Sequence, residues 1–320
     1  MELLEVKNLK TYFKTQKGMV KAVDGVSYSL DYGKVLGLVG ESGCGKTTTA
    51  LSIAKLLPPE GEIVSGEILL EGEDLLKLSK NKFKRKRWKD VSIIFQGAMS
   101  ALNPVMKVGL QIAEALMLHE KLTYKQAMNR TKELFKLVEI DENRVSNYPH
   151  EFSGGMKQRV MIAMALACNP KVVIGDEPTT ALDVMVQAQI LNLLEKLKKE
   201  INMGLILITH DLSVLGEICD NVCVMYAGKI VENGTVEKIF NNHKHPYTHK
   251  LIKAFPNIHG ERKLSTSIPG NPPNLLTPPS GCRFHPRCEF ADEKCRTKEP
   301  ELNKVGDHHF VACHYGGAFI

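Results

Sequence analysis

The sequence has no long hydrophobic run. Its longest uninterrupted apolar stretch, residues 160–168, is about half of the length that a bilayer-spanning helix needs. Its first ten residues, MELLEVKNLK, place no apolar block behind a basic flank. We therefore expect neither a transmembrane helix nor a signal peptide, and a protein that stays in the cytosol with reduced cysteines.

The sequence also has no internal repeat and no strong compositional bias. Hydrophobic residues make up 43% of the chain and charged residues 24%, which excludes collagen-like and wholly disordered chains and leaves enough material for a core. A length of 320 residues accommodates one large domain with a smaller appendage.

Acidic residues are missing from one segment that accounts for the net charge. The chain carries +6, but residues 80–89 hold seven positive charges and no acid, and removing these seven from +6 leaves −1. A run of this kind is usually the solvated face of a helix, with membrane headgroups or an acidic partner surface as the next alternatives. The charge alone therefore does not indicate nucleic acid binding.

Short runs of branched apolar residues alternate with helix-like segments over residues 1–240, which is typical of an α/β protein. Runs followed by Gly or polar turns predict buried strands of a largely parallel sheet at 35–39, 91–95, 172–174 and 205–208. Helical spacing over about 97–167 predicts a helical insertion. After residue 240 prolines accumulate and predict a tail without regular helix. We therefore expect domains at 1–240 and 241–320.

The clearest motif follows the first predicted strand. Residues 40–47, GESGCGKT, match G-x-x-x-x-G-K-[ST] at every fixed position and precede a helix-like segment at 48–57. The glycines let backbone N–H groups surround phosphate oxygens, Lys46 reaches the β and γ phosphates, and Thr47 offers its hydroxyl to Mg²⁺. The residues predicted to bind a nucleoside triphosphate here are Gly40, Ser42, Gly43, Cys44, Gly45, Lys46, Thr47 and Thr48.

Polar residues at the ends of the other predicted strands supply the remaining chemistry. We expect Asp176 and Gln96, with Thr47, to hold Mg²⁺, and Glu177 to polarise the attacking water. His210 also follows a strand, and the carboxyl ends of parallel strands share one edge of a sheet, so these side chains can converge on one triphosphate. The predicted catalytic residues are Glu177, His210 and Gln96.

The segment 152–159, FSGGMKQR, resembles the signature loop of ATP-binding cassette (ABC) ATPases. With the phosphate loop, the glutamine loop, the acidic pair, the segment 181–183 and the switch histidine, six motifs appear in family order over the first three quarters of the chain. The resemblance implies a P-loop NTPase of the ABC type: a RecA-like parallel core, an antiparallel β subdomain, a helical subdomain at about 97–167, and here a small loop-rich, cysteine-containing C-terminal domain.

The resemblance also implies further nucleotide contacts. The signature residues Ser153, Gly154 and Gly155 would serve the nucleotide held by the opposite cassette of a head-to-tail dimer, and Asp183 would lie near the nucleotide. An aromatic residue near the start would stack on adenine, with Phe13 fitting the family position best and Tyr12 as its competitor. The family usually has Gln at position 156, where this chain has Met.

Several stretches resemble the ATPase subunits of dipeptide and oligopeptide importers: SALNPVMKVGLQ at 100–111, the Met in FSGGMKQR, GDEPTTALDV at 175–184, HPYT at 245–248, and the cysteine tail. This implies ATP-driven peptide uptake at the cytoplasmic face of the membrane. The implied partners are a second ABC ATPase subunit (a paralogue, or a second copy in isolation), two permeases and an extracytoplasmic substrate-binding protein, without nucleic acid.

Three other functions remain open. Nickel and oligosaccharide importers share much of the same pattern. A soluble ABC ATPase that acts on nucleic acid would use residues 80–89 and the cysteine tail as contacts. A regulatory protein that binds ATP without hydrolysis is disfavoured by the presence of both Glu177 and His210.

Four of the eight cysteines fall close together near the end of the sequence, at Cys282, Cys288, Cys295 and Cys313. Reduced thiols in a loop-rich segment suggest one metal-centred staple. Structural zinc favours tighter Cys-x2–4-Cys pairs, whereas a [4Fe–4S] cluster takes four thiolates on irregular loops. We therefore predict a [4Fe–4S] cluster, with Zn²⁺ and free thiols as the alternatives.

Overall fold

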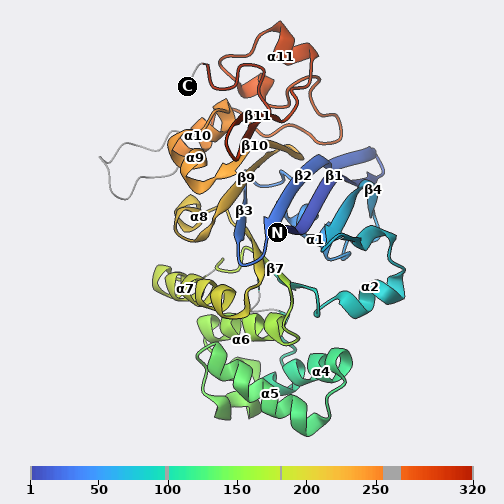
Figure 1. The fold of residues 1–320 in the computed structure, drawn as a ribbon, viewed down its shortest axis with the longest axis vertical. Helices are drawn as coiled ribbons and strands as arrows, with labels where there is room; N and C mark the ends of the chain where they lie inside the picture. The colour runs from blue at the N-terminus through green and yellow to red at the C-terminus, as the bar shows by residue number, and fades with distance from the viewer. Residues whose placement is uncertain (1, 98–100, 181, 255–267, 319–320) are drawn as a thin grey trace. The chain divides into compact units, whose positions relative to one another are not determined.

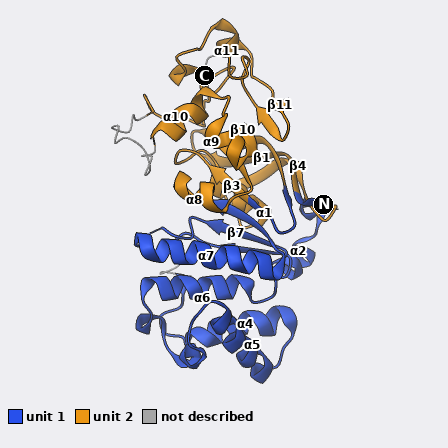
Figure 2. Cartoon of the chain, turned by 60° about the vertical axis from the view of Figure 1, so that its left-hand side comes forward, with its two compact units in different colours: residues 1–4, 30–35, 74–208 blue, residues 5–29, 36–73, 209–320 orange. Residues whose placement is uncertain are grey.

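The computed structural model describes residues 2–97, 101–180, 182–254 and 268–318 (Figure 1). The chain forms two compact units that alternate along the sequence (Figure 2). Unit 1 comprises residues 1–4, 30–35 and 74–208, and unit 2 comprises residues 5–29, 36–73 and 209–320. The predicted phosphate loop therefore belongs to unit 2, whereas the predicted acidic pair and signature loop belong to unit 1.

Unit 1 contains three neighbouring parallel strands in the order β8-β7-β6. Every residue of β7 and β8 is buried, which explains why their sequences are apolar except for Asp176 at the end of β7. The strands are β6 (Val91–Ile94), β7 (Val172–Asp176) and β8 (Gly204–Ile208). Three of the predicted strands are thus confirmed, although β6 ends one residue earlier than expected.

Unit 1 has helices within, before and after the range 97–167 that was predicted as a helical insertion. They are α2 (Lys80–Lys86), α4 (Val108–Glu120), α5 (Tyr124–Leu137), α6 (Gly154–Leu166) and α7 (Val184–Ile201), with 3₁₀ turns at Leu75–Lys77, Glu142–Ser146 and Pro149–Glu151. Helices α6 and α7 lie side by side in Figures 1 and 2. Residues 98–100, the last of which begins the stretch resembling peptide importers, and residue 181 lie outside the described residues.

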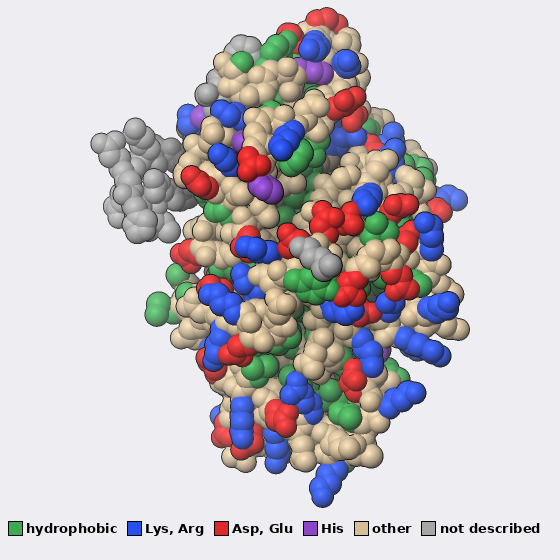
Figure 3. All heavy atoms as spheres, viewed as in Figure 1, with side chains coloured by type: hydrophobic (Ala, Val, Ile, Leu, Met, Phe, Trp, Pro, Cys, Tyr) green, Lys and Arg blue, Asp and Glu red, His purple; other side chains and the backbone are tan. Residues whose placement is uncertain are grey.

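The basic run is a solvated helix face, as the sequence suggested. Its apolar residue, Phe83, is buried, while most of the lysines and arginines of α2 are exposed. Two of the run's lysines form ion pairs, Lys86 with Asp90 at 3.1 Å and Lys89 with Glu120 at 3.2 Å. On the face drawn in Figure 3, Lys and Arg side chains gather over the α2 stretch and are interspersed with acids elsewhere.

Unit 2 contains a mixed sheet in which the C-terminal region supplies two strands. β3 (Val35–Val39) pairs in parallel with β9 (Asn221–Tyr226), and antiparallel pairing continues through β10 (Lys229–Thr235), β12 (His309–Val311) and β11 (Asn303–Gly306). A second sheet has the order β2-β1-β4-β5. Its strands are β1 (Glu2–Thr15), β2 (Gly18–Asp31), β4 (Gly61–Leu70) and β5 (Glu73–Asp74).

A buried carboxylate attaches the C-terminal region to β10. Glu232 is 0% exposed and accepts hydrogen bonds from the Lys244 and His245 backbone N–H groups, at 2.6 and 3.0 Å. Its Oε1 also lies 2.8 Å from His309 Nε2 on β12. Because each partner would be left unsatisfied without Glu232, this side chain fixes both the entry to the region and its last hairpin.

The prediction that no regular helix follows residue 240 is wrong. Helix α10 (Pro246–Ala254) begins at a proline, where the missing N–H is not needed inside the helix. The other helices of unit 2 are α1 (Lys46–Ile53), α8 (Leu212–Ile218), α9 (Val236–Asn241) and α11 (Glu293–Thr297), with a 3₁₀ turn at His285–Arg287. Over the described ranges, no helix has both the length and the hydrophobicity that crossing a membrane requires.

Candidate nucleotide site

The phosphate loop of unit 2 has a backbone that only glycine can adopt at two positions. Gly40 and Gly45 have φ of 152° and 107°. A Cβ at these residues would lie 2.1 Å from the Met225 carbonyl oxygen and 2.3 Å from that of Ala22. Gly43, with φ of 77°, has open space around it. The loop shape therefore depends on the glycines of the motif, with neighbouring backbone packed directly against it.

The start of α1 is suited to an anion. Gly45 precedes it without a side-chain cap, and its first turn contains no acid. Lys46 is 7% exposed, and its Nζ donates to the carbonyl oxygens of Gly40 (2.7 Å) and Glu41 (3.0 Å) within the loop. The N-terminal N–H groups of a helix are not used by the helix itself and carry partial positive charge. The loop thus combines a buried ammonium with a helix start, as a phosphate site requires.

Tyr12 and Phe13 point to opposite sides of β1, because side chains alternate along a strand. Tyr12 donates a hydrogen bond from its hydroxyl to Asp24 Oδ1 at 2.7 Å, and burial together with this bond raises the pKa of Tyr12 to about 12. Thr11, which shares the side of Phe13, bonds through its hydroxyl to Ser52 on α1 at 2.8 Å. Phe13 therefore lies on the side of β1 from which Thr11 contacts α1, the helix that follows the phosphate loop. Tyr12 lies on the opposite side.

In unit 1 the predicted catalytic residues Gln96 and Glu177 meet. Gln96 Nε2 donates to Glu177 Oε2 at 2.6 Å, and Thr180 Oγ1 donates to the same oxygen at 2.9 Å. Glu177 has a positive φ of 48°, a left-handed conformation that it shares with other non-glycine residues of the described chain. Asp176, at the end of β7, is 3% exposed. Thr180 was not predicted, since a lone threonine after an acidic pair carries no sequence signal.

The signature residues have structural contacts of their own within unit 1. Ser153 caps α6, its Oγ accepting from the Met156 N–H at 3.4 Å, and Asp183 caps α7 by accepting from the Val186 N–H at 2.9 Å. A Cβ at Gly155 would lie 2.6 Å from Val186 Cγ1. Helix α6 begins at Gly154, so both signature glycines are in its first turn. The predicted nucleotide contacts of these residues stay predictions, as does the role of the exposed His210 in unit 2.

The four C-terminal cysteines line one small cavity of about 20 Å³ in unit 2. Burial raises the pKa of Cys282 to about 12 and also raises the pKa of Cys288 and Cys295. Two of the cysteines are joined by a backbone hydrogen bond, which the Cys282 N–H donates to the Cys295 carbonyl at 2.8 Å. Across the parts of the chain that the structure describes, no three His, Cys, Asp or Glu side chains stand in a metal-binding arrangement. The four cysteines are therefore together, as predicted.

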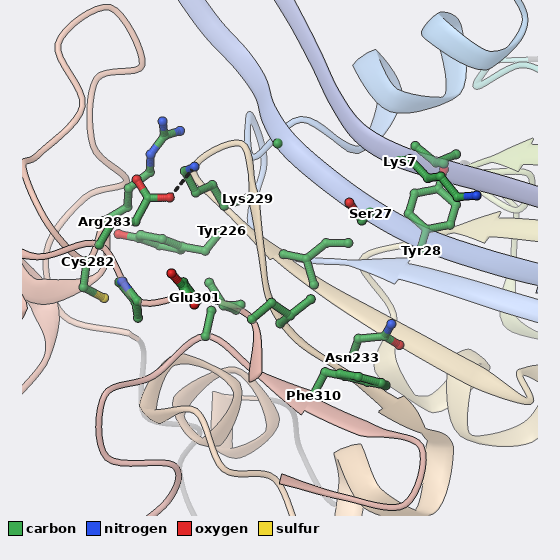
Figure 4. Close-up of a pocket in the computed structure, with 18 of the residues that line it drawn as sticks. Lys7, Ser27, Tyr28, Tyr226, Lys229, Asn233, Cys282, Arg283, Glu301 and Phe310 are labelled. Atoms are coloured by element: carbon green, nitrogen blue, oxygen red, sulfur yellow. Dashed lines mark ion pairs between the residues drawn. The ribbon is translucent and has the colours of Figure 1, made fainter. Parts of the chain in front are cut away.

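A larger cavity of about 770 Å³ lies elsewhere in unit 2 (Figure 4). Its wall includes Lys7, Tyr28 and Phe310, and the dashed line in Figure 4 marks the ion pair between Lys229 and Glu299. Residues predicted to contact nucleotide are not part of its lining. This cavity is therefore separate from the candidate nucleotide site.

Comparisons with known proteins identify the family. Residues 23–180 match the model of the ABC transporter family, and residues 231–295 match that of the oligopeptide/dipeptide transporter C-terminal region. The chain is 52% identical over 314 residues to the oligopeptide transport ATP-binding protein OppD of Bacillus subtilis, covering 97% of this chain and 87% of the relative. The chain belongs to the ATP-binding subunits of ABC transporters.

Other relatives agree with this membership. The dipeptide transport ATP-binding protein DppD of Escherichia coli is 42% identical over 317 residues, which span 98% of this chain and 97% of that protein. A solved dimeric bacterial ABC transporter cassette is similar with a TM-score of 0.66 and 25% identity over 73% of this chain and 98% of the cassette. An ABC subunit of this family is an ATPase with a P-loop fold, so both the expected fold class and the expected enzyme class are confirmed.

Proposed function

We propose that this ABC subunit hydrolyses ATP to drive the uptake of dipeptides or oligopeptides through a membrane transporter. The observation that carries the proposal is the match of residues 231–295 to the C-terminal region of oligopeptide and dipeptide transporters, because a cassette alone does not specify the solute. The OppD and DppD relatives, whose names give peptides as the transported solute, support it over nearly the whole chain.

The proposed chemistry assigns a role to each group of residues. The phosphate loop binds the triphosphate, Phe13 stacks on adenine, Glu177 polarises the attacking water, and Gln96 and His210 complete the reacting centre. Mg²⁺ neutralises phosphate charge when it is bound, and the oxygen atoms of Thr47, Gln96 and Asp176 are the type of ligand that it prefers. Gln96 donates to Glu177 through its amide nitrogen, so its amide oxygen takes no part in this hydrogen bond.

The proposed assembly contains a second ABC subunit, two permeases and an extracytoplasmic binding protein, with this chain on the cytoplasmic side of the membrane. We also propose residues 1–240 as the cassette and 241–320 as its appended domain. The dimeric state of the solved cassette supports pairing of two ABC subunits.

The test is reconstitution of the chain with its permeases, partner ATPase and binding protein in proteoliposomes. Uptake of labelled di- and oligopeptides should require internal ATP and be abolished by Lys46→Ala. Uptake of Ni²⁺ or of oligosaccharides in place of peptides would contradict the peptide proposal while leaving the ATPase assignment intact.

We further propose that Cys282, Cys288, Cys295 and Cys313 hold a [4Fe–4S] cluster, with Zn²⁺ as the alternative. Support comes from the four thiols that line one cavity, where a bound metal would displace their protons. Four thiolates are the full ligand set of a cubane cluster. A bound metal would link the loops of a segment that has little core of its own.

Anaerobic purification tests this site. We expect a brown protein with broad absorbance at the blue end of the spectrum and iron and sulfide in nearly equal amounts. Cys288→Ser should abolish the colour, whereas Cys168→Ser, at a buried cysteine of unit 1, should not. A colourless protein with stoichiometric zinc would overturn the iron assignment, and one with neither metal would overturn the site.

A further inference from the structure

The phosphate loop is held from outside by two residues of the C-terminal region, all within unit 2. The contact point is Glu41, the second residue of the loop. Its carboxylate receives both terminal nitrogens of Arg287, with Nη1 to Oε2 at 2.6 Å and Nη2 to Oε1 at 3.0 Å. Its backbone N–H donates to the Tyr247 hydroxyl at 2.9 Å. The chain separation of Arg287 and Glu41 is 246 residues, so only the fold brings them together.

Every N–H group of Arg287 is used to hold it in this position. A guanidinium has five such groups. Besides the two bonds to Glu41, Nη1 donates to the Tyr226 hydroxyl at 3.3 Å, Nε to the Pro269 carbonyl at 2.7 Å, and Nη2 to the Ile268 carbonyl at 3.3 Å. The side chain is 5% exposed. The hydrogen bonds to Glu41 raise the pKa of Arg287 above its ordinary value, so its charge is permanent.

Glu41 also makes hydrogen bonds to other residues of the phosphate loop. Its carbonyl oxygen accepts from Lys46 Nζ at 3.0 Å and from the Cys44 N–H at 3.2 Å. One residue thus joins Arg287 and Tyr247 to the lysine of the phosphate motif. A two-bond pair between guanidinium and carboxylate fixes orientation as well as distance, and in this pair the Arg287 side chain is 5% exposed and that of Glu41 24%.

Arg287 and Tyr247 are supported by a buried aromatic cluster. Tyr226, Tyr247 and Phe284 form an aromatic cluster with ring centroids 4.6 to 5.4 Å apart, and each is 1% exposed or less. Phe284 and Arg287 both lie between two of the clustered cysteines, Cys282 and Cys288. The segment that carries these cysteines is therefore packed against the loop that is proposed to bind phosphate.

We propose that Arg287, assisted by Tyr247, is a positioning residue that fixes the phosphate loop in the conformation that receives the triphosphate. This proposal rests on the proposed role of the loop in ATP binding. Without the clamp the unliganded loop samples more conformations, and ATP must order it on binding. Removing the clamp should therefore weaken the affinity for ATP, while the rate of the chemical step is preserved.

The experiment measures binding of a fluorescent ATP analogue with Mg²⁺ to the full chain. Arg287→Ala should weaken binding about tenfold, within the range of couplings between residues in contact. Arg287→Lys, which keeps the charge but not the two-bond geometry, should recover part of the loss. Arg296→Ala, at an exposed arginine of the same region, is the matched control and should bind like wild type. In the assembled transporter Arg287→Ala should raise KM for ATP with kcat nearly unchanged.

A double-mutant cycle separates positioning from general destabilisation. If Arg287 acts through Glu41, Arg287→Ala should have little further effect in a Glu41→Ala background. An equal loss in both backgrounds, or no loss in either, would overturn the proposal. If Arg287→Ala does not fold, Tyr247→Phe removes a single hydroxyl from the same contact and should weaken binding by about threefold; unchanged affinity there would count equally against it. Failure of the proposed function is recognised separately, because wild type and Lys46→Ala would then bind the analogue alike.

Discussion

Glu177, the proposed polarising residue, is constrained at the scale of a single residue. Its carboxylate oxygen is held by Gln96 and Thr180, and its backbone has an uncommon positive φ. The constraint fixes the direction of the carboxylate before any nucleotide arrives.

Glu177→Gln should therefore retain ATP binding and lose turnover by about 10²- to 10⁴-fold, the usual cost of removing a positioned base. Glutamine keeps the size of the side chain and can still accept from Gln96. The measurement is ATP binding and steady-state hydrolysis in the assembled transporter, with the exposed Glu133→Gln as control. Near-normal hydrolysis by Glu177→Gln would remove Glu177 from the proposed chemistry.

The two aromatic candidates for adenine stacking have opposite expected phenotypes. Phe13→Ala should raise KM for ATP about tenfold, because stacking of a base on an aromatic ring is worth about 1–3 kcal/mol. Tyr12→Phe should leave KM unchanged and lower the melting temperature slightly, since it removes only the bond to Asp24. ATP titrations and thermal unfolding of both variants decide between them, and the reverse pattern would assign stacking to Tyr12.

The sequence predicted residues that belong to contiguous motifs and missed those defined by distant partners. Lys46 and the loop glycines are readable because the phosphate site needs them at fixed spacing. Arg287 and Tyr247 are not readable, because their role depends on Glu41, more than two hundred residues away. Thr180 was missed for a related reason, since its bond to Glu177 depends on a local turn.

At the scale of elements, strands were predicted correctly where the sequence contains a short continuous run of apolar residues. The strands β3, β7 and β8 are buried at every position and, apart from Asp176 at the end of β7, have apolar sequences. The long strands β1 and β2 are exposed in part and contain charged residues, so only the family resemblance implied an antiparallel sheet. Helix α10 was missed because prolines near it were interpreted as breakers, although Pro246 occupies the position that tolerates proline.

The contact between α6 and α7 gives Gly155 a packing role that is separate from any nucleotide contact. Gly155→Ala should lower the melting temperature, because the new Cβ would lie 2.6 Å from Val186 Cγ1. Val186→Ala removes that atom, so the double variant should regain most of the lost stability. Thermal unfolding of the two single variants and the double variant measures this compensation, and additive losses would mean that Gly155→Ala acts elsewhere.

At the scale of the whole molecule, the net charge says little about partners. The excess is confined to residues 80–89, where Lys86 and Lys89 are already paired with acids of the same unit. The family and the contacts of the phosphate loop carry the functional assignment instead. The phosphate loop belongs to unit 2, whereas Gln96, Asp176 and Glu177 belong to unit 1.

A signature loop that serves a neighbouring cassette makes association depend on nucleotide. We expect Glu177→Gln to associate with itself or with a related ABC subunit when Mg²⁺ and ATP are added, as measured by sedimentation. Ser153→Ala in that background should prevent association. Because Ser153 also caps α6, its loss costs about 1 kcal/mol of stability, and Thr123→Ala, which removes the cap of α5, reproduces that cost at a distance from the signature.

If the Thr123→Ala variant still associates and the Ser153→Ala variant does not, Ser153 contributes more than helix capping. That result would support a nucleotide contact by its hydroxyl. If both variants associate, the signature hydroxyl is a cap alone. If the Glu177→Gln chain binds ATP yet stays monomeric with every candidate partner, the shared-site arrangement fails, because a closed pair trapped before hydrolysis is the state in which such a site should be most stable.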